Sequence, residues 1–443
     1  AGTGLDDDRR LAAATPTAVT AIARDRRRRD PQDRRTGATA RRGHRGRAPS
    51  PRVRRRDGGG ARAEPGLDTP LLIRTRAYLG IHDVLDPFRF AVEFQDSRRY
   101  GSRFEPDNRD INEFDLTGLY ADLYFREALG RDALNHPRPL SLRAGRMNFE
   151  FLDRRLLGNN QWRNNANTFE GFRITLGHEA NDWQLDLLAV QPLLRREYDF
   201  DRPVDGQWVY AAIGHWRRWS EIITLEPYYL GLMQDERPGV AERRIHSAAL
   251  RGYGVVPGTR FDFDFDAVFQ FGTDAGRTHR AFGFTGEIGY TFPHPWHPRL
   301  SAFYGYASGD RDPDDDRSER FERFYGFARP WSANDYIQWE NIHAPKARLE
   351  IQPRENFRMD AGWSWYWLAS DTDRWNVADL RDPTGRSGSF MGHEFDARAR
   401  WTVNRHIEAI LGYAHFTPGG FTRNAGKGRD SDFLYLEITL NAF

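Results

Sequence analysis

The sequence predicts an all-β protein, a large antiparallel transmembrane β-barrel of about 18 strands. Three observations predict it. Apolar and polar residues alternate with a period of two in segment after segment from residue 68 to residue 443. These segments run about 9–14 residues, longer than the five or six of an ordinary soluble strand. The connections between them alternate between short and long, which is typical of outer-membrane barrels with tight turns at one rim and long loops at the other.

Composition agrees with export to a membrane. Aromatic residues make up 14% of the 443 residues, yet the mean hydropathy is only −0.75. No run approaches the roughly 18 apolar residues of a transmembrane helix. Cysteine is absent, which excludes disulfides and thiolate metal sites. The net charge of +2 gives the whole chain little electrostatic bias.

Residues 1–67 form a separate, Arg-rich segment with almost no aromatic residues. Such a composition predicts disorder, because little apolar surface is available for burial. We interpret the segment as non-native coding sequence, from a wrong start or a frame error, with the signal peptide missing. The alternative is a basic arm for nucleic acid or acidic lipid headgroups; we expect outer-membrane lipid to be a partner and nucleic acid not to be one.

The strands follow in order from residue 70. Short connections are expected at Asn404, at residues 354–356 and at residues 256–258, and long loops at 148–167, 309–341, 371–388 and 418–430. Seventeen strands are counted, at 70–81, 87–97, 113–127, 139–147, 168–177, 183–193, 207–218, 221–234, 243–254, 259–272, 279–292, 299–308, 342–353, 357–370, 389–403, 405–417 and 431–443. Bacterial single-chain barrels have an even number. We therefore expect an eighteenth strand before Leu71, lost or scrambled in this chain.

The two faces of these strands differ in chemistry. In FDFDFDAVFQFG (261–272), phenylalanines occupy one face and aspartates the other. Trp363, Trp365 and Trp367 follow the same pattern. We assign the aromatic face to lipid and the charged face to a water-filled lumen. The lumen acids predicted in this way are Asp262, Asp264, Asp266, Asp360 and Asp396. The basic residues on this face are Arg143, Arg173, Arg251, Lys346, Arg348, Arg358, Arg398 and Arg400. They either line the pore or form structural ion-pair ladders with the acids; the sequence leaves both open.

A family resemblance rests on several ordered motifs. The segment LRAGRMNFEFLDRRLLGNNQWRNNANTFEGFRITL (142–176) resembles the most characteristic segment of the alginate-export family of outer-membrane barrels. Further similar motifs are FQDSRRYG (94–101), the run 304–326 with WENI after it, GHEFDARARW (392–401) and GYAHFTPGGF (412–421). The resemblance implies a passive outer-membrane channel of Gram-negative cells whose arginines face an anionic polysaccharide or sugar acid. It makes Arg143 and Arg173 the first pore candidates, followed by Arg146, Arg154 and Arg155. The last strand places Phe443 out of phase with the apolar residues before it, which implies a bulge.

Other chemistry receives less support from the residues. Asp310, Asp312 and Asp314 have the oxygen spacing of a Ca²⁺ loop, but Pro313 interrupts the run and no Gly or Glu completes an EF-hand; an acidic loop is the alternative. No other cofactor is expected. Ser247 and His246 point to opposite faces of one strand, so no catalytic constellation is recognised and we expect no enzyme. An adhesin that uses its long loops, or a non-selective porin, are the alternative functions. The oligomeric state is left open.

Overall fold

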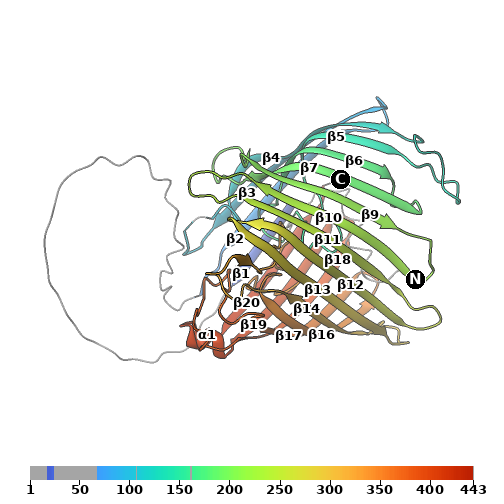
Figure 1. Ribbon diagram of the computed structural model, residues 1–443. Coiled ribbons are helices and arrows are strands. Elements are labelled where there is room, and N and C mark those ends of the chain that lie inside the picture. The colour runs from blue at the N-terminus through green and yellow to red at the C-terminus, as the bar shows by residue number, and fades with distance from the viewer. Residues whose placement is uncertain (1–16, 24–66, 106, 160–161, 443) are drawn as a thin grey trace.

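The computed structural model describes residues 17–23, 67–105, 107–159 and 162–442, and these form one β-barrel with obliquely running strands (Figure 1). Of the 20 strands formed by these residues, β8 (Arg202–Pro203) and β15 (Arg317–Ser318) have two residues each, and the other eighteen have 7 to 15. Among the same residues, no helix is long and apolar enough to cross a bilayer.

The bounds of the long strands follow the predicted ranges closely. They are β1 (Thr17–Ala23), β2 (Leu71–Ile81), β3 (Phe88–Tyr100), β4 (Asn112–Phe125), β5 (Leu140–Met147), β6 (Phe169–Gly177), β7 (Trp183–Leu194), β9 (Gln207–Trp216), β10 (Ile223–Gln234), β11 (Arg243–Val255), β12 (Phe261–Asp274), β13 (Arg277–Thr291), β14 (Arg299–Ala307), β16 (Ile342–Arg354), β17 (Phe357–Trp367), β18 (Phe390–Asn404), β19 (Ile407–Pro418) and β20 (Ser431–Leu440). A single-turn helix, α1 (Gly420–Asn424), lies in the last loop. The all-β prediction and all seventeen predicted strands are confirmed.

The eighteenth strand is β1, which lies inside the Arg-rich segment. It pairs antiparallel with β2, where Ala18 opposes Arg74, and with β20, where Ala18 opposes Thr439. The expectation that this strand is lost from the chain is therefore wrong. The physical reason is that β2 and β20 would otherwise present open edges at membrane depth, and TAVTAIA is an apolar run without arginine that can pair with both. The predicted disorder of the remaining tail, and the predicted bulge at Phe443, lie outside the described residues.

The two rims differ in loop length, as predicted. Two residues join β16 to β17 and two join β18 to β19, whereas 148–168, 308–341 and 368–389 are long loops at the opposite rim. The separation has exceptions: 126–139 is a longer connection at the short-turn rim, 235–242 is a short one at the long-loop rim, and at that rim only Ala275 and Gly276 join β12 to β13. Both have positive φ, 54° and 81°, the conformation of the tight hairpin turn that matches strand twist.

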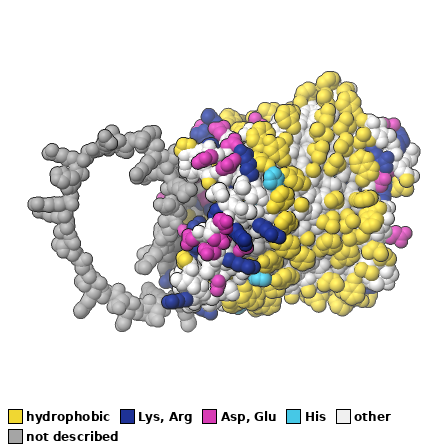
Figure 2. Space-filling model, viewed as in Figure 1, with side chains coloured by type: hydrophobic (Ala, Val, Ile, Leu, Met, Phe, Trp, Pro, Cys, Tyr) yellow, Lys and Arg dark blue, Asp and Glu magenta, His cyan; other side chains and the backbone are white. Residues whose placement is uncertain are grey.

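Apolar side chains cover the outside of the barrel wall. Figure 2 shows them as a broad band over the strands, with charged residues gathered toward the ends. On β12, Phe261, Phe269 and Phe271 are exposed, whereas Asp262 is 7% and Asp266 1% exposed. The predicted division of this strand into an aromatic outer face and a charged inner face is confirmed.

A charge on this outer face should cost more near the membrane centre than at the rim. Phe269 lies near the middle of β12 and Phe261 is its first residue. We expect Phe269→Arg to lower the free energy of unfolding in lipid vesicles by about 2–4 kcal/mol and Phe261→Arg by about 0–1 kcal/mol. Urea unfolding of the two variants measures both values. Equal losses would show that β12 does not cross the bilayer as described.

Part of the barrel interior is apolar rather than wet. Inward-facing Val209 and Ile213 on β9, Leu230 on β10, Ile245 on β11 and Val268 on β12 are at most 1% exposed. They belong to one buried cluster together with aromatic and aliphatic residues of the loops 148–168 and 308–341. The interior on this side is therefore filled by loops, which the period-2 pattern did not predict.

Candidate functional site

Two long loops fold into the barrel, and we call them the first inner loop (148–168) and the second inner loop (308–341). The first contributes Phe149, Phe151, Leu156 and Leu157 to the buried cluster, each at most 6% exposed. The second contributes aromatic residues of which Phe321 is 0% exposed. Burying these side chains against the inner wall holds both loops in the lumen.

The inner loops are joined to each other by hydrogen bonds to backbone carbonyls. The amide N–H of Tyr325 donates to the carbonyl of Leu156 at 2.9 Å. Asn167 Nδ2 donates to the carbonyls of Gly158 at 2.9 Å and Tyr325 at 3.1 Å. At Gly326 an added Cβ would lie 1.6 Å from the carbonyl oxygen of Arg155, so only glycine permits this close approach. The two loops therefore act as one body.

The second inner loop contacts widely separated parts of the wall. At one end, Gln270 of β12 accepts from the amide N–H of Glu322 at 2.7 Å, and Gln207 of β9 donates to the Tyr325 hydroxyl at 2.7 Å. At the other end, the hydroxyl of Tyr366 on β17 donates to the carbonyl of Trp331 at 2.7 Å. The loop therefore crosses the lumen from β9–β12 to β17.

The tip of the first inner loop reaches the last strand. Trp162 packs edge-on against Tyr435 of β20, with ring centroids 4.6 Å apart. The Arg329 guanidinium of the second inner loop stacks on Trp162 at 3.7 Å and donates to the Tyr435 hydroxyl. Arg163 and Asp335 form an ion pair between the two loops. Together the inner loops form a partition across the lumen.

Arg143 and Arg173 lie directly opposite one another on β5 and β6. Arg143 Nη2 is 3.0 Å from Asp122 Oδ2, and Arg173 Nη2 is 2.7 Å from Asp186 Oδ1. Like charges that face each other across neighbouring strands destabilise a sheet. Each arginine is offset by its own buried carboxylate, while the pair keeps two guanidinium groups side by side on the lumen wall.

Of the three arginines predicted at the loop, Arg146 lies on β5, whereas Arg154 and Arg155 lie in the first inner loop. Arg146 lies 3.4 Å from Asp115 and 3.3 Å from Glu170. Arg154 lies 3.7 Å from Glu150. Arg155 pairs with Asp153 and stacks over the Phe303 and Trp331 rings. The contacts of Arg154 and Arg155 stabilise the first inner loop, whereas those of Arg146 join β5 to β4 and β6.

Arg251 is the centre of a buried ionic cluster on β10–β12. Its Nη1 is 2.8 Å from Glu226 Oε2 and its Nε donates to Asp264 Oδ1 at 3.1 Å. Asp266 accepts from the Tyr228 hydroxyl at 2.8 Å. This arginine is only 3% exposed, so the cluster is structural in this conformation.

The remaining predicted charges form a ladder on β16–β18. Lys346 Nζ donates to Asp396 Oδ2 at 2.8 Å, while Asp360 lies 3.2 Å from Arg348 and 2.8 Å from Arg398. One carboxylate thus serves two arginines. Two residues from Asp360 and Arg398 toward the short-turn rim, Arg358 and Arg400 directly oppose each other. They form a second arginine pair like that of Arg143 and Arg173.

The sequence analysis missed Arg299 among the lumen cations, as it missed the buried Arg74 and Arg76 of β2. Arg299, the first residue of β14, donates to Asp262 at 2.9 Å, Glu287 at 2.8 Å and Glu350 at 2.7 Å. These three acids come from three other strands, so only the strand register brings them together. The ladder alternative left open by the sequence is present for most of the predicted charges.

The aspartates of the predicted calcium loop do not gather. Asp310 is 4% exposed and lies 3.0 Å from Arg277 Nη1, whereas Asp312 and Asp314 are exposed. In the part of the chain that the structure describes, no group of three or more His, Asp or Glu side chains could hold a metal ion. The geometry gives the calcium hypothesis no support.

A buried acid pair links the β7–β8 loop to β4. The amide N–H of Asp201 donates to Asp115 Oδ2 at 3.0 Å, and Asn112 Nδ2 lies 3.3 Å from Asp201 Oδ2. Burial, and then the negative charge of Asp115, raise the pKa of Asp201 to about 7. Arg146 also faces the pair, donating to the Asp201 carbonyl at 2.9 Å.

This acid pair predicts a loop that loosens as pH rises. An acid whose pKa is raised by folding stabilises the folded loop. This stabilisation is fully present when the pH is below the pKa of the unfolded chain, about 3.9, and it is lost as the pH rises through the folded pKa of about 7. We expect amide hydrogen exchange at residues 195–206, corrected for intrinsic rates, to speed up between pH 5 and pH 8. Asp201→Asn should flatten this dependence, whereas Asp199→Asn, an exposed carboxylate in the same loop, should not. An unchanged profile in Asp201→Asn would refute the assignment.

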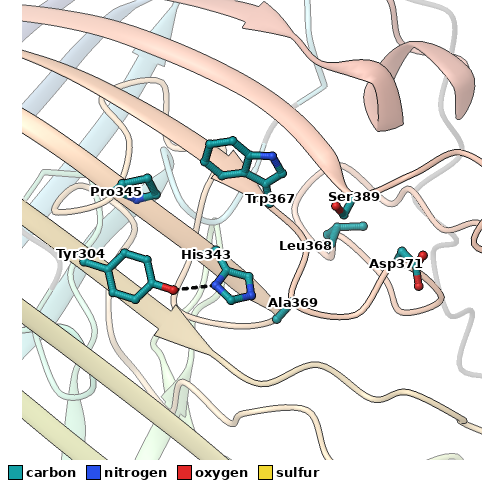
Figure 3. Close-up of a pocket in the computed structure, with 8 residues that line it drawn as sticks. All are labelled: Tyr304, His343, Pro345, Trp367, Leu368, Ala369, Asp371 and Ser389. Atoms are coloured by element: carbon teal, nitrogen blue, oxygen red, sulfur yellow. Dashed lines mark hydrogen bonds between the residues drawn. The ribbon is translucent and has the colours of Figure 1, made fainter.

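A separate pocket of about 580 Å³ lies on the outside of the wall (Figure 3). Outward-facing Tyr304, His343 and Trp367 line it together with residues of the 368–389 loop, and the Tyr304 hydroxyl is 2.7 Å from His343 Nδ1. Because these side chains point away from the lumen, the pocket is not part of the candidate path.

Comparisons with known proteins agree with this architecture. A family model described as alginate export matches residues 50–435. Among solved structures, Pseudomonas aeruginosa OpdQ is similar with a TM-score of 0.58 and 12% identity over 97% of each chain. Pseudomonas aeruginosa OpdK with vanillate has a TM-score of 0.58 and 11% identity, over 96% of this chain and 98% of that one. Acinetobacter baumannii OccAB1 has a TM-score of 0.56 and 12% identity over 98% of each chain. No curated protein matched the sequence.

Proposed function

Because the chain belongs to the alginate-export family and is an outer-membrane β-barrel channel of Gram-negative cells, we propose that it conducts an anionic carbohydrate, a polyuronate or a sugar acid, by passive diffusion. The observation that carries the proposal is the placement of arginines directly opposite one another, Arg143 with Arg173 and Arg358 with Arg400. Such pairs oppose folding, and they provide adjacent planar donors for carboxylates.

The neighbouring acids suit transport better than tight binding. Asp122, Asp186 and Asp360 already accept from the lumen arginines. A passing carboxylate therefore exchanges with an acid of the wall rather than meeting a bare cation, which keeps each site weak. No covalent step is part of this function, and we propose no catalytic residue.

Planar-bilayer recording of the purified full chain tests the proposal. Under a KCl gradient we expect a reversal potential that shows anion preference, and with potassium glucuronate we expect a measurable glucuronate current. Arg143→Ala and Arg173→Ala should each reduce the anion preference, while Arg311→Ala, a loop arginine whose side chain is 82% exposed, should not. A cation preference that survives both lumen substitutions would overturn the anionic substrate and leave a non-selective porin. Absence of any current, with cell binding retained, would favour the adhesin.

A further inference from the structure

Glu394 is a fully buried carboxylate on the lumen face of β18. Its side chain is 0% exposed, and it lies on the same face as Asp396 and Arg398. A buried carboxylate without partners costs several kcal/mol, so the groups around it must satisfy its oxygens.

Three donors of one short segment of the second inner loop converge on Glu394. Ser332 Oγ donates to Oε2 at 2.7 Å, Asn334 Nδ2 donates to Oε2 at 2.9 Å, and the Ala333 amide N–H donates to Oε1 at 2.7 Å. Ser332 and Asn334 are each 1% exposed. A hydroxyl, a side-chain amide and a backbone N–H around two oxygens form a complete carboxylate-binding site.

The two ends of the second inner loop differ in how far polar contacts hold them. The end near β9–β13 is held by buried aromatic residues, including Phe321 and Phe324, in the large apolar cluster. The end near β18–β20 is held by the polar contacts of Glu394 and by the 2.7 Å hydrogen bond between Tyr336 and Ser431. Apolar contacts add to these, because Ala333 packs in a small buried cluster with residues of β19 and β20 and Tyr336 packs edge-on against Phe416. Apolar burial has no competitor in water, whereas a hydrogen-bonded carboxylate can be exchanged for another carboxylate at little net cost.

We propose that Ser332, Ala333 and Asn334 form a carboxylate-binding site that Glu394 occupies while the partition is closed, and that a carboxylate of the transported solute displaces Glu394 and frees this end of the loop. The proposal rests on the anionic substrate proposed above. Glu394 is tethered and so has a high effective concentration. A polyuronate, with many carboxylates on one chain, competes better than a single sugar acid. Glu394 is a positioning residue, because it acts through the loop.

Removal of the tethered carboxylate provides the test. In planar bilayers with chloride as the anion, we expect Glu394→Ala to raise the single-channel conductance by roughly twofold or more, because the loop end is released into the lumen. Acetate added at constant chloride competes with Glu394 and should raise the wild-type conductance toward that of Glu394→Ala, whereas it should leave Glu394→Ala unchanged and bromide should change neither. Glu394→Gln, which keeps the shape and one acceptor oxygen, should be intermediate.

A second variant separates a carboxylate site from a merely structural contact. The double substitution Ser332→Ala and Asn334→Ala removes two donors, so it should raise the conductance as Glu394→Ala does and should not respond to acetate. It also serves if Glu394→Ala fails to fold, as judged by heat-modifiable migration. Wild-type conductance in both variants, or no acetate response of the wild-type barrel, overturns the inference alone. No current from the wild-type barrel would overturn the proposed function and this inference with it.

Discussion

Shortening the second inner loop should give the largest change in conductance, a severalfold increase. The loop leaves β14 and enters β16 at neighbouring positions, because Ala307 opposes Ile342. A tight glycine turn can therefore replace residues 310–339, as Ala275 and Gly276 already join β12 to β13. The expected increase follows from removing the part of the partition that crosses from β9–β12 to β17. Single-channel recording in symmetric KCl measures it.

The shortened barrel should also be less stable, since Val268, Ile245 and Leu230 would lose their apolar cover. The matched control removes residues 236–240 from the short β10–β11 loop, which contributes nothing to the buried cluster. That control should leave conductance and stability near the wild-type values. Equal conductance in all three barrels would mean that the solute path does not pass the second inner loop.

The strands could be predicted because each of their faces meets a different solvent. In FDFDFDAVFQFG successive residues face lipid and the lumen in turn, so apolar and polar residue types alternate with a period of two. The parity of loop lengths fixed which strand ends share a rim. β1 was expected at its place in the order but not recognised in its residues, since seven residues of Ala, Thr, Val and Ile carry no alternation.

The position of the inner loops could not be predicted, because the alternation of residues along the strands does not indicate where the loops between them fold. A signal was present: the segment 321–339 carries Phe321, Phe324, Trp331 and Trp339 in a region without strand alternation. Soluble surfaces rarely expose an apolar patch of this size, and burial inside the barrel accounts for these aromatic residues. Residue type indicated burial, but only the fold shows that the lumen is the place.

The charged wall was predicted in kind but not in pairing. Sequence parity placed Lys346, Arg348 and Arg398 on the inner face, and the register then determines that Asp396 and Asp360 are their partners. Arg299 was missed because it begins a strand, where alternation has no preceding residue to establish it. The pairing of charges along the wall therefore depends on the strand register, which cannot be read from the composition.

Reversing the second arginine pair should give the largest change in ion selectivity. Arg358 and Arg400 oppose each other near the short-turn end of β17–β18, with Arg398 and Asp360 as the next pair along the same strands. The double substitution Arg358→Glu and Arg400→Glu changes the local charge by four units at one mouth of the lumen. We expect the anion-to-cation permeability ratio to fall by about tenfold or more, about 1.4 kcal/mol in relative barrier height. The reversal potential under a KCl gradient measures this ratio.

Salt dependence distinguishes a local field from a general charge effect. The Debye length falls from about 10 Å at 0.1 M to about 3 Å at 1 M salt, so the change in selectivity should shrink strongly between these concentrations. The control is Arg311→Glu with Arg317→Glu, which makes the same change of net charge on two exposed residues of the long-loop rim. It should shift selectivity little at either concentration. If the control and the lumen variant shift the reversal potential equally, the arginine pair does not act on the permeating ion, and the field of the whole barrel, rather than the wall of the lumen, selects the solute.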